Sequence, residues 1–147
     1  MPASLPTTRT GSAGLGLALV IVAVDLTLTT AYIHFTLGGT LFMLNAAGYA
    51  ALAAGLLLFS VPHPLLRRFA WLPRLALIGY TATTIAAYVV IGPYFSLGWI
   101  AKAIEVAILV LLAVVAADLL RLYGSPGGVA RSVIGSLRPG SPPMRAA

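Results

Sequence analysis

The sequence predicts an all-α fold: a bundle of four antiparallel transmembrane helices with both termini in the cytoplasm. Of its 147 residues, 60% are hydrophobic and 8% are charged, whereas soluble domains carry about 25% charged residues. The apolar residues fall into four runs near the roughly 20 residues that a helix needs to cross a bilayer. The basic residues lie outside these runs, except for Lys102 in the fourth run and Arg121 at its end. Composition, run length and charge placement therefore all predict a multi-pass membrane protein.

The first span is predicted at about residues 13–33, after a polar, proline-containing segment at 1–12 that we expect to be disordered. A secretory signal is the alternative for this run, since it also lies near the N-terminus. Signal peptides have apolar cores of typically 7–15 residues and end at a small-residue cleavage site. Asp25 interrupts the run and no clean A-x-A site follows it. The run is therefore predicted to be an uncleaved helix.

The second span is predicted at about residues 40–60, after the uncharged break HFTLGGT at 34–40. Its Gly38-Gly39 pair favours a tight connection, because glycine adopts backbone angles that other residues avoid. The first two helices are therefore expected to be antiparallel neighbours. Residues 61–74 contain three prolines and three arginines. Because proline ends helices and removes a hydrogen-bond donor, we expect a loop at the membrane surface there.

The third and fourth spans are predicted at about residues 75–91 and 98–121, separated by a short segment that contains Gly92-Pro93. They complete a transmembrane domain over residues 13–123. The remaining residues, 124–147, are rich in glycine, proline and serine with scattered arginines. Such a composition buries too little apolar surface to offset the entropy lost on ordering. A disordered basic tail is therefore expected.

The orientation is predicted from the arginines, because lysine and arginine near span ends stay in the cytoplasm. With four helices, Arg9, the 61–74 loop and the tail all lie on one side, while the loops around Gly38 and Tyr94 carry no charge. A three-helix alternative would place charged segments on both sides. We therefore expect a multi-pass protein of the cell membrane with both termini cytoplasmic, and we attribute the net charge of +6 to topology rather than to nucleic-acid binding.

Each predicted span carries one polar stripe at the spacing of a helix face. The stripes contain Asp25, Thr29 and Tyr32; Asn45, Gly48 and Gly55; Thr81, Thr84 and Tyr88; and Lys102 with Glu105. A rise of about 1.5 Å per residue places the charged members at similar depths, in the outer half of the bundle. The sequence therefore predicts a polar cluster in a cavity that opens away from the cytoplasm. The candidate residues are Asp25, Tyr32, His34, Asn45, Thr84, Tyr88, Lys102 and Glu105.

Two interpretations of this cluster stay open. Polar contacts between helices hold membrane bundles in register, so the cluster is consistent with a purely structural role. A charged side chain at the bilayer centre costs roughly 2.5–3.5 kcal/mol on insertion scales, which favours a function in proton, ion or ligand handling. Asp25 adds to the second interpretation, because two carboxylates share Lys102 and an unpaired carboxylate in a low dielectric tends to take up a proton.

Three further features of the sequence narrow the range of possible functions: its two histidines, the small residues of the second span, and the absence of known catalytic motifs. His34 is consistent with an interfacial residue, with a ligand to a metal or haem, or with a proton relay. His63 is predicted on the opposite side of the membrane, so the two histidines do not form one site. The small residues of the second span at every fourth position are consistent with a dimer face or with packing inside the protomer. The sequence lacks cysteine and the common catalytic motifs. We therefore expect no catalytic residue, no metal site and no cofactor.

The segment HFTLGGTLFMLNAAGY at 34–49, together with Gly79-Tyr80, the Gly-Pro-Tyr at 92–94 and the helix of Lys102 and Glu105, resembles an uncharacterised family of small four-helix bacterial and archaeal integral membrane proteins. The resemblance covers roughly residues 15–120. It implies a four-helix integral membrane fold and no particular activity.

The sequence thus favours a non-catalytic protein or a subunit of a membrane assembly. Its expected partners are the lipid bilayer and either further copies of the chain or other membrane subunits. One alternative is a small oligomeric transporter or channel for protons, ions or solutes that uses Asp25, Lys102 and Glu105. The other is a membrane enzyme or cofactor-binding protein that uses His34.

Overall fold

The computed structural model describes residues 10–61, 63, 66, 69–123, 131 and 134–135. The described chain forms four long helices, which are α1 (Thr10–Leu37), α2 (Thr40–Leu58), α4 (Trp71–Ile91) and α5 (Ser96–Tyr123). Each contains a stretch long and apolar enough to cross a membrane, and these stretches are Gly16–Leu37, Thr40–Leu58, Trp71–Ile91 and Ser96–Val114. The predicted all-α fold with four membrane-length helices is confirmed.

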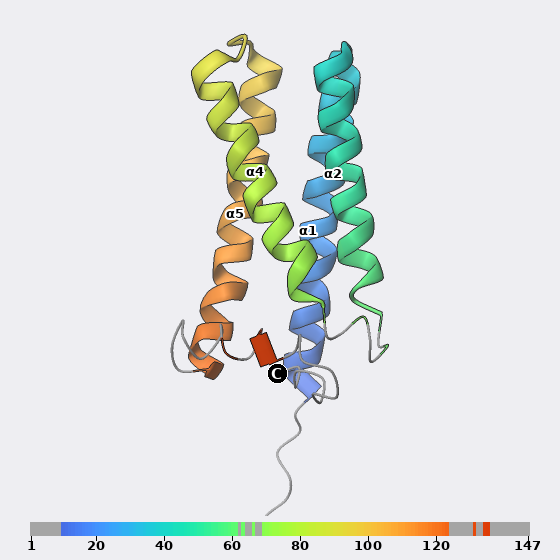
Figure 1. Cartoon of the computed structure of the whole chain (residues 1–147), viewed down its shortest axis with the longest axis vertical. Helices are drawn as coiled ribbons and strands as arrows, with labels where there is room; N and C mark the ends of the chain where they lie inside the picture. Colours follow the sequence, from blue (N-terminus) through green and yellow to red (C-terminus); the bar gives the residue numbers. More distant parts are fainter. Residues whose placement is uncertain are drawn as a thin grey trace, which may run out of the picture.

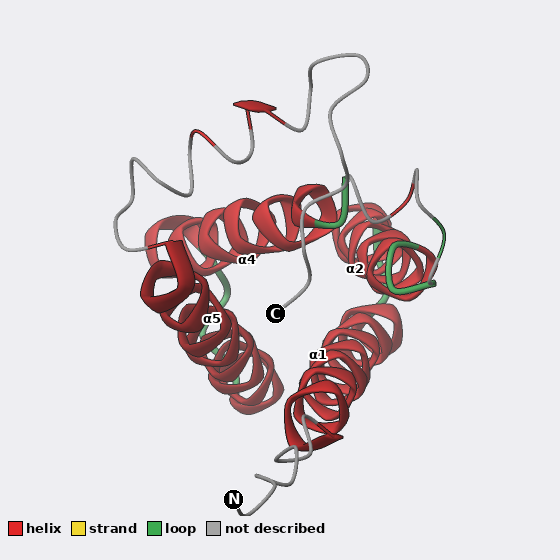
Figure 2. Ribbon diagram, turned by 90° about the horizontal axis from the view of Figure 1, so that it is seen from below, coloured by secondary structure: helices red, strands yellow, loops and turns green. Residues whose placement is uncertain are grey.

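The four helices enclose a common interior (Figure 2). The main contacts join α1 to α2, α1 to α5, α4 to α5 and α2 to α4. Figure 1 shows α4 inclined to the other helices, with its Trp71 end beside α2 and its Ile91 end beside α5. The helices α2 and α4 therefore diverge toward the end of the bundle that contains the connections at 38–39 and 92–95, which we call the short-loop end.

The connection between α1 and α2 is shorter than predicted. The helix α1 continues through His34 to Leu37, so only Gly38 and Gly39 lie between the two helices. Both glycines have positive φ angles, 68° and 78°, which a residue with a Cβ rarely adopts. The expected break at 34–40 is therefore wrong for residues 34–37, because a drop in hydropathy does not interrupt the backbone hydrogen bonds of a helix.

Two other helix starts differ from the predicted boundaries for a similar reason. The helix α4 begins at Trp71, inside the predicted surface loop, and contains Pro73 in its first turn. Proline is tolerated there because the first N–H groups of a helix have no acceptor within the helix. The helix α1 begins at Thr10, so residues 10–12 are helical rather than disordered. The rest of the predicted disordered ends lies largely outside the described residues.

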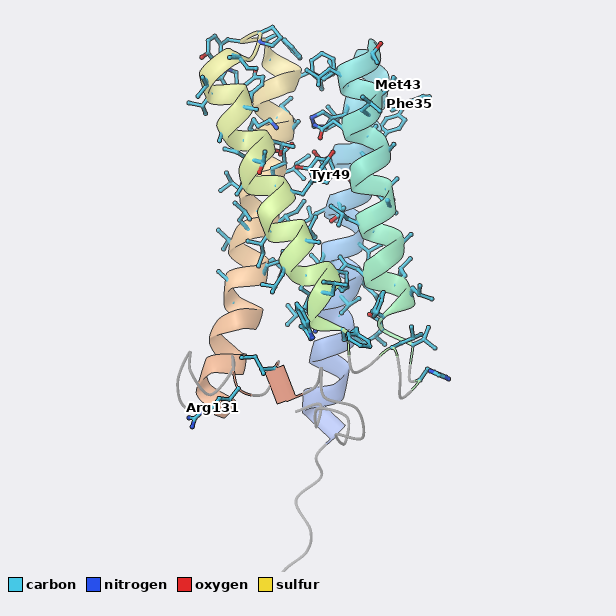
Figure 3. The ribbon with its side chains drawn as sticks, in the orientation of Figure 1. Phe35, Met43, Tyr49 and Arg131 are labelled. Atoms are coloured by element: carbon cyan, nitrogen blue, oxygen red, sulfur yellow. The ribbon has the colours of Figure 1, made fainter. Side chains whose placement is uncertain are left out.

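An apolar core fills the part of the bundle farther from the short-loop end. Its buried side chains come from all four helices and include Leu77 and Ile108, which are both fully buried. Many large apolar side chains lie instead on the outside of the bundle, as expected where lipid replaces water as the surrounding solvent. Figure 3 shows Phe35 and Met43 on the outer side of the bundle, while Tyr49 lies among the polar side chains of its interior.

Candidate functional site

Glu105 is the centre of a buried polar cluster. Its side chain is 0% exposed, and it projects from α5 into the interior of the bundle. Groups from α1, α4 and α5 itself surround its carboxylate. A buried carboxylate is stable only when charged or hydrogen-bonding partners compensate for its lost hydration.

Lys102 supplies the compensating charge from one helical turn away. Its Nζ lies 2.7 Å from Oε1 and 2.5 Å from Oε2 of Glu105. The same ammonium group is 3.4 Å from the backbone oxygen of Thr84 and 5.5 Å from the centre of the Tyr88 ring. Its three hydrogens therefore have acceptors nearby, and its positive charge faces an aromatic ring.

Thr84 connects the carboxylate to Tyr49. The Thr84 hydroxyl lies 2.9 Å from Oε2 of Glu105 and 2.7 Å from the Tyr49 hydroxyl. When Thr84 donates its one hydrogen to the carboxylate, its oxygen accepts from Tyr49. This chain of hydrogen bonds joins α2, α4 and α5. Tyr49 is fully buried, so its hydroxyl depends on hydrogen-bond partners inside the bundle.

His34 and Thr30 bring α1 to the same carboxylate. The Thr30 hydroxyl donates to Oε1 of Glu105 over 3.4 Å, and the His34 Nε2 lies 3.8 Å from the same oxygen. The His34 Nδ1 is 2.8 Å from the backbone oxygen of Thr30. Because a carbonyl oxygen only accepts, Nδ1 carries a hydrogen and Nε2 is the nitrogen that faces Glu105.

Tyr80 and Asn45 form a second pair between α2 and α4. The Tyr80 hydroxyl donates to Oδ1 of Asn45 over 2.7 Å, and its ring meets the Tyr49 ring edge-on with the centroids 5.0 Å apart. Gly48 makes this position available, because a Cβ on Gly48 would lie 2.2 Å from the Tyr80 hydroxyl oxygen. The small residue of α2 and the tyrosine of α4 are therefore complementary.

A pocket of about 270 Å³ lies above these groups, at the short-loop end. Its polar lining consists of His34, Asn45, Tyr80, Thr83, Thr84, Tyr88 and Lys102, and its other lining residues are mainly apolar. Glu105 is absent from the lining and lies beneath it. Five of the eight predicted residues thus line one pocket, and a sixth lies directly under its floor.

The structure corrects the prediction for Asp25 and Tyr32, which do not join this cluster. Both side chains are exposed on the outside of α1, and Tyr32 is 68% exposed. The buried face of α1 carries Thr27, Thr30 and His34 instead. The prediction assumed that the most polar face of a membrane helix points inward, whereas α1 has polar groups on two faces.

Three residues of the cluster were absent from the predicted candidates. They are Thr30, Tyr49 and Tyr80. Thr30 lies four residues before His34 and so shares its helix face, and this spacing was the available signal. Tyr49 lies four residues after Asn45 in the same way. Tyr80 had no comparable signal, because its role depends on how α4 crosses α2.

The chemical capacity of the cluster is limited by its balance of charge. Its one acid is paired with one lysine, and histidine is the only other titratable base beside them. The predicted excess of acid is therefore wrong, because Asp25 lies elsewhere. Within the described residues, no group of three or more His, Cys, Asp or Glu side chains is arranged to hold a metal ion. The geometry is that of a closed ion pair beneath a mainly apolar pocket.

The sequence matches no protein-family model, and comparisons with curated proteins and with solved structures give no match either.

Thr84→Val is the isosteric test of the hydrogen-bond chain. The substitution keeps the shape of the side chain but removes the group between Tyr49 and Glu105. We expect a loss of about 1–3 kcal/mol of unfolding free energy, because the Tyr49 hydroxyl and the Glu105 carboxylate each lose a buried hydrogen bond. Reversible unfolding in bicelles measures this loss. Thr83→Val is the matched control, since the Thr83 hydroxyl bonds only to its own helix, at the Gly79 oxygen. Equal effects of the two substitutions would contradict the proposed chain.

Proposed function

We propose that this protein is a non-catalytic subunit of a membrane assembly, with four antiparallel spans and both termini in the cytoplasm. The observation that carries the proposal is the position of Asp25. Its carboxylate is exposed on the outer side of α1, and it makes no hydrogen bond or ion pair with another side chain in the described part of the chain. A partner outside the bundle would supply the positive charge that Asp25 lacks within it.

The depth of Asp25 supports this reading. The apolar stretch of α1 runs over Gly16–Leu37, so Asp25 lies about 14 Å from one end and about 18 Å from the other at 1.5 Å per residue. A charge near the bilayer centre costs roughly 2.5–3.5 kcal/mol. Aspartate is also too short to extend its carboxylate to the membrane surface as lysine and arginine do. Such residues are almost always paired or directed to a protein interior.

The partner expected from this chemistry is a transmembrane helix of another protein that carries a lysine or arginine at mid-membrane depth. A second copy of the chain would bring a second Asp25, and its Lys102 is buried against Glu105. The contact surface is the outer face of α1, which consists of the exposed residues Ile21, Val22, Asp25, Leu28, Thr29 and Tyr32. Apolar side chains on both sides of Asp25 would exclude lipid headgroups and water from the ion pair.

The basic residues support the proposed orientation. The segment at 61–74 contains three arginines, while residues 38–39 and 92–95 contain none. The positive-inside tendency then places 61–74 and both termini in the cytoplasm. Because the chain has no cysteine, single cysteines at Tyr94 and Ser60 report their own sides. A membrane-impermeant maleimide added to intact cells is expected to label Tyr94→Cys and not Ser60→Cys; the reverse pattern would overturn the orientation.

Cross-linking from the outer face of α1 tests the subunit proposal. A photoreactive amino acid in place of Leu28, one turn from Asp25, is expected to cross-link to a transmembrane peptide that contains lysine or arginine. Asp25→Asn keeps the size of the side chain and removes its charge, so we expect the cross-linked fraction to fall about tenfold, equivalent to about 1.4 kcal/mol. Mass spectrometry of the cross-linked peptides measures both results.

Two controls make this test specific. Asp25→Glu keeps the charge and is expected to retain most of the cross-link. Asp25→Lys alone, or an acidic residue alone at the basic position of the partner, is expected to lower the cross-linked fraction. The two changes together exchange the charges and are expected to restore it. Cross-links only to lipid or to a second copy, or a yield unchanged by Asp25→Asn, would refute the proposal.

A further inference from the structure

We infer that the pocket between α2 and α4 binds an uncharged, mainly apolar molecule with a hydrogen-bond-accepting carbonyl group, which enters sideways from the hydrocarbon layer. The inference is independent of the proposed subunit contact, because that contact lies on α1. It rests on the mouth of the pocket, on its walls, and on one unpartnered donor at its floor.

The mouth of the pocket opens between two helices. Leu41 and Leu44 of α2 and Ile91 of α4 line the pocket and are also 73%, 65% and 77% exposed on the outer surface. Ala87 of α4 likewise lines the pocket and is exposed. A mouth bordered by these apolar side chains, within two membrane-length helices, faces lipid tails. A ligand that partitions into the bilayer reaches this opening by lateral diffusion.

The walls of the pocket favour a ligand with an apolar body. Side chains such as Phe42, Phe95 and Leu37 lie around the space. A volume of about 270 Å³ exceeds the roughly 150 Å³ of an engineered apolar cavity that holds benzene. The pocket therefore accommodates a ring or the first part of an acyl chain, and the rest of a longer molecule extends through the mouth into the bilayer.

The floor supplies one free donor, the side-chain amide of Asn45. The Tyr80 hydroxyl occupies its Oδ1, which fixes the orientation of the amide and leaves Nδ2 as the donor. Among the described residues, Nδ2 has no hydrogen-bond partner. A donor in mainly apolar surroundings gains free energy from any acceptor that arrives. A carbonyl oxygen on an apolar molecule is the simplest group that fits.

The charges around the floor favour an uncharged ligand. The hydrogens of Lys102 Nζ are directed to Glu105 and to the Thr84 backbone, and the His34 Nδ1 hydrogen is directed to the Thr30 backbone. An anion would meet the Glu105 carboxylate without a free cation to bind it. A cation would be repelled by the Lys102 ammonium group, and the Glu105 carboxylate is already paired with that lysine. A neutral carbonyl avoids both repulsions.

The test uses a monoacylglycerol with a photoreactive diazirine and an alkyne in its chain, added to the full chain in lipid nanodiscs. After irradiation, labelled peptides are expected to come from residues 40–45 and 83–91, on the two sides of the mouth. Unlabelled monoacylglycerol is expected to compete. The carboxylate of the same chain at alkaline pH and the corresponding alkane are expected to compete at least about tenfold less well, a difference of about 1.4 kcal/mol.

A phospholipid also carries ester carbonyls on an apolar body, so a diacyl phospholipid with the same diazirine is the second probe. Labelling of the same peptides by both probes identifies bilayer lipid as a source of the ligand, and labelling by the monoacylglycerol alone identifies a free single-chain molecule. The inference is overturned if neither probe labels residues 40–45 or 83–91.

Two variants locate the site, each checked for helical content and thermal unfolding. Asn45→Leu removes the free donor, and Ala87→Trp fills the mouth from an exposed position that no polar contact uses. Each is expected to lower labelling about tenfold, the loss that corresponds to about 1.4 kcal/mol. Thr36→Val changes an exposed polar side chain of α1 that does not line the pocket and whose hydroxyl bonds to its own helix, at the Ile33 oxygen, so it is expected to leave labelling unchanged. Unaltered labelling in folded Asn45→Leu and Ala87→Trp proteins, or equal competition by the carboxylate, would overturn the inference.

Discussion

Replacing Glu105 with glutamine is expected to destabilise the protein by about 3–5 kcal/mol, the range for a buried ion pair that loses one partner. Glutamine occupies nearly the same space, so the expected loss comes from charge rather than from a cavity. It leaves the Lys102 ammonium buried without its carboxylate, which lies 2.5 Å away in the native protein. Unfolding by steric trapping in bicelles measures the change in free energy directly.

A double-mutant cycle distinguishes the ion pair from general disruption. Lys102→Met removes the cation and keeps an unbranched side chain. We expect Glu105→Gln combined with Lys102→Met to cost less than the sum of the single changes, with a coupling of about 0.5–3 kcal/mol. Strictly additive effects would show that the two residues stabilise the bundle independently, in conflict with their geometry.

Gly48→Ala is expected to have the second large effect. A Cβ at this position would lie 2.2 Å from the hydroxyl oxygen and 2.5 Å from the Cζ of Tyr80. The tyrosine would have to leave its hydrogen bond to Asn45 and its edge-on contact with Tyr49. Overpacking of this kind costs typically about 1–3 kcal/mol. Thermal unfolding in detergent, at constant detergent-to-protein ratio, measures the loss.

Gly79→Ala is the matched control, because it makes the same chemical change in a helix interior. A Cβ at Gly79 meets no atom within 4 Å. Alanine is about 1 kcal/mol more favourable than glycine in a helix, so we expect this variant to be as stable as the wild type or more so. If both alanine variants stabilise the protein, the close approach of α2 and α4 at Gly48 is wrong.

The number of membrane-length helices followed from the sequence because the signal is long and averaged over many residues. About 20 apolar residues in a row leave few alternatives to a spanning helix. The residues at which the helices begin and end were harder to predict, for a physical reason. Hydropathy reports where lipid ends, whereas a helix ends where its hydrogen bonds do, so α1 extends past His34 to Leu37 and α4 begins at Trp71.

The buried face of the helix was predictable for α5 but not for α1. Lys102 and Glu105 are the only charged residues of the stretch Ser96–Val114. They lie one turn apart, so the face that they share had to be the polar one. On α1, Asp25 competes with Thr27, Thr30 and His34 for that role. In a membrane the lipid tails are as apolar as a protein core, so the hydrophobic residues of α1 give no indication of which face is buried. Only the complete packing selects the face of Thr30 and His34.

The pairing of Lys102 with Glu105 also bears on how the chain enters the membrane. The two residues lie three positions apart on the same helix, so their charges meet as soon as one turn of α5 has formed. On the proposed topology, α5 would therefore enter the bilayer with this pair of charges already neutralised, without a neighbouring helix to do so. Asp25 has no such companion on α1. Insertion of the first span, rather than of the fourth, is therefore the step of biogenesis at which a partner protein would matter most.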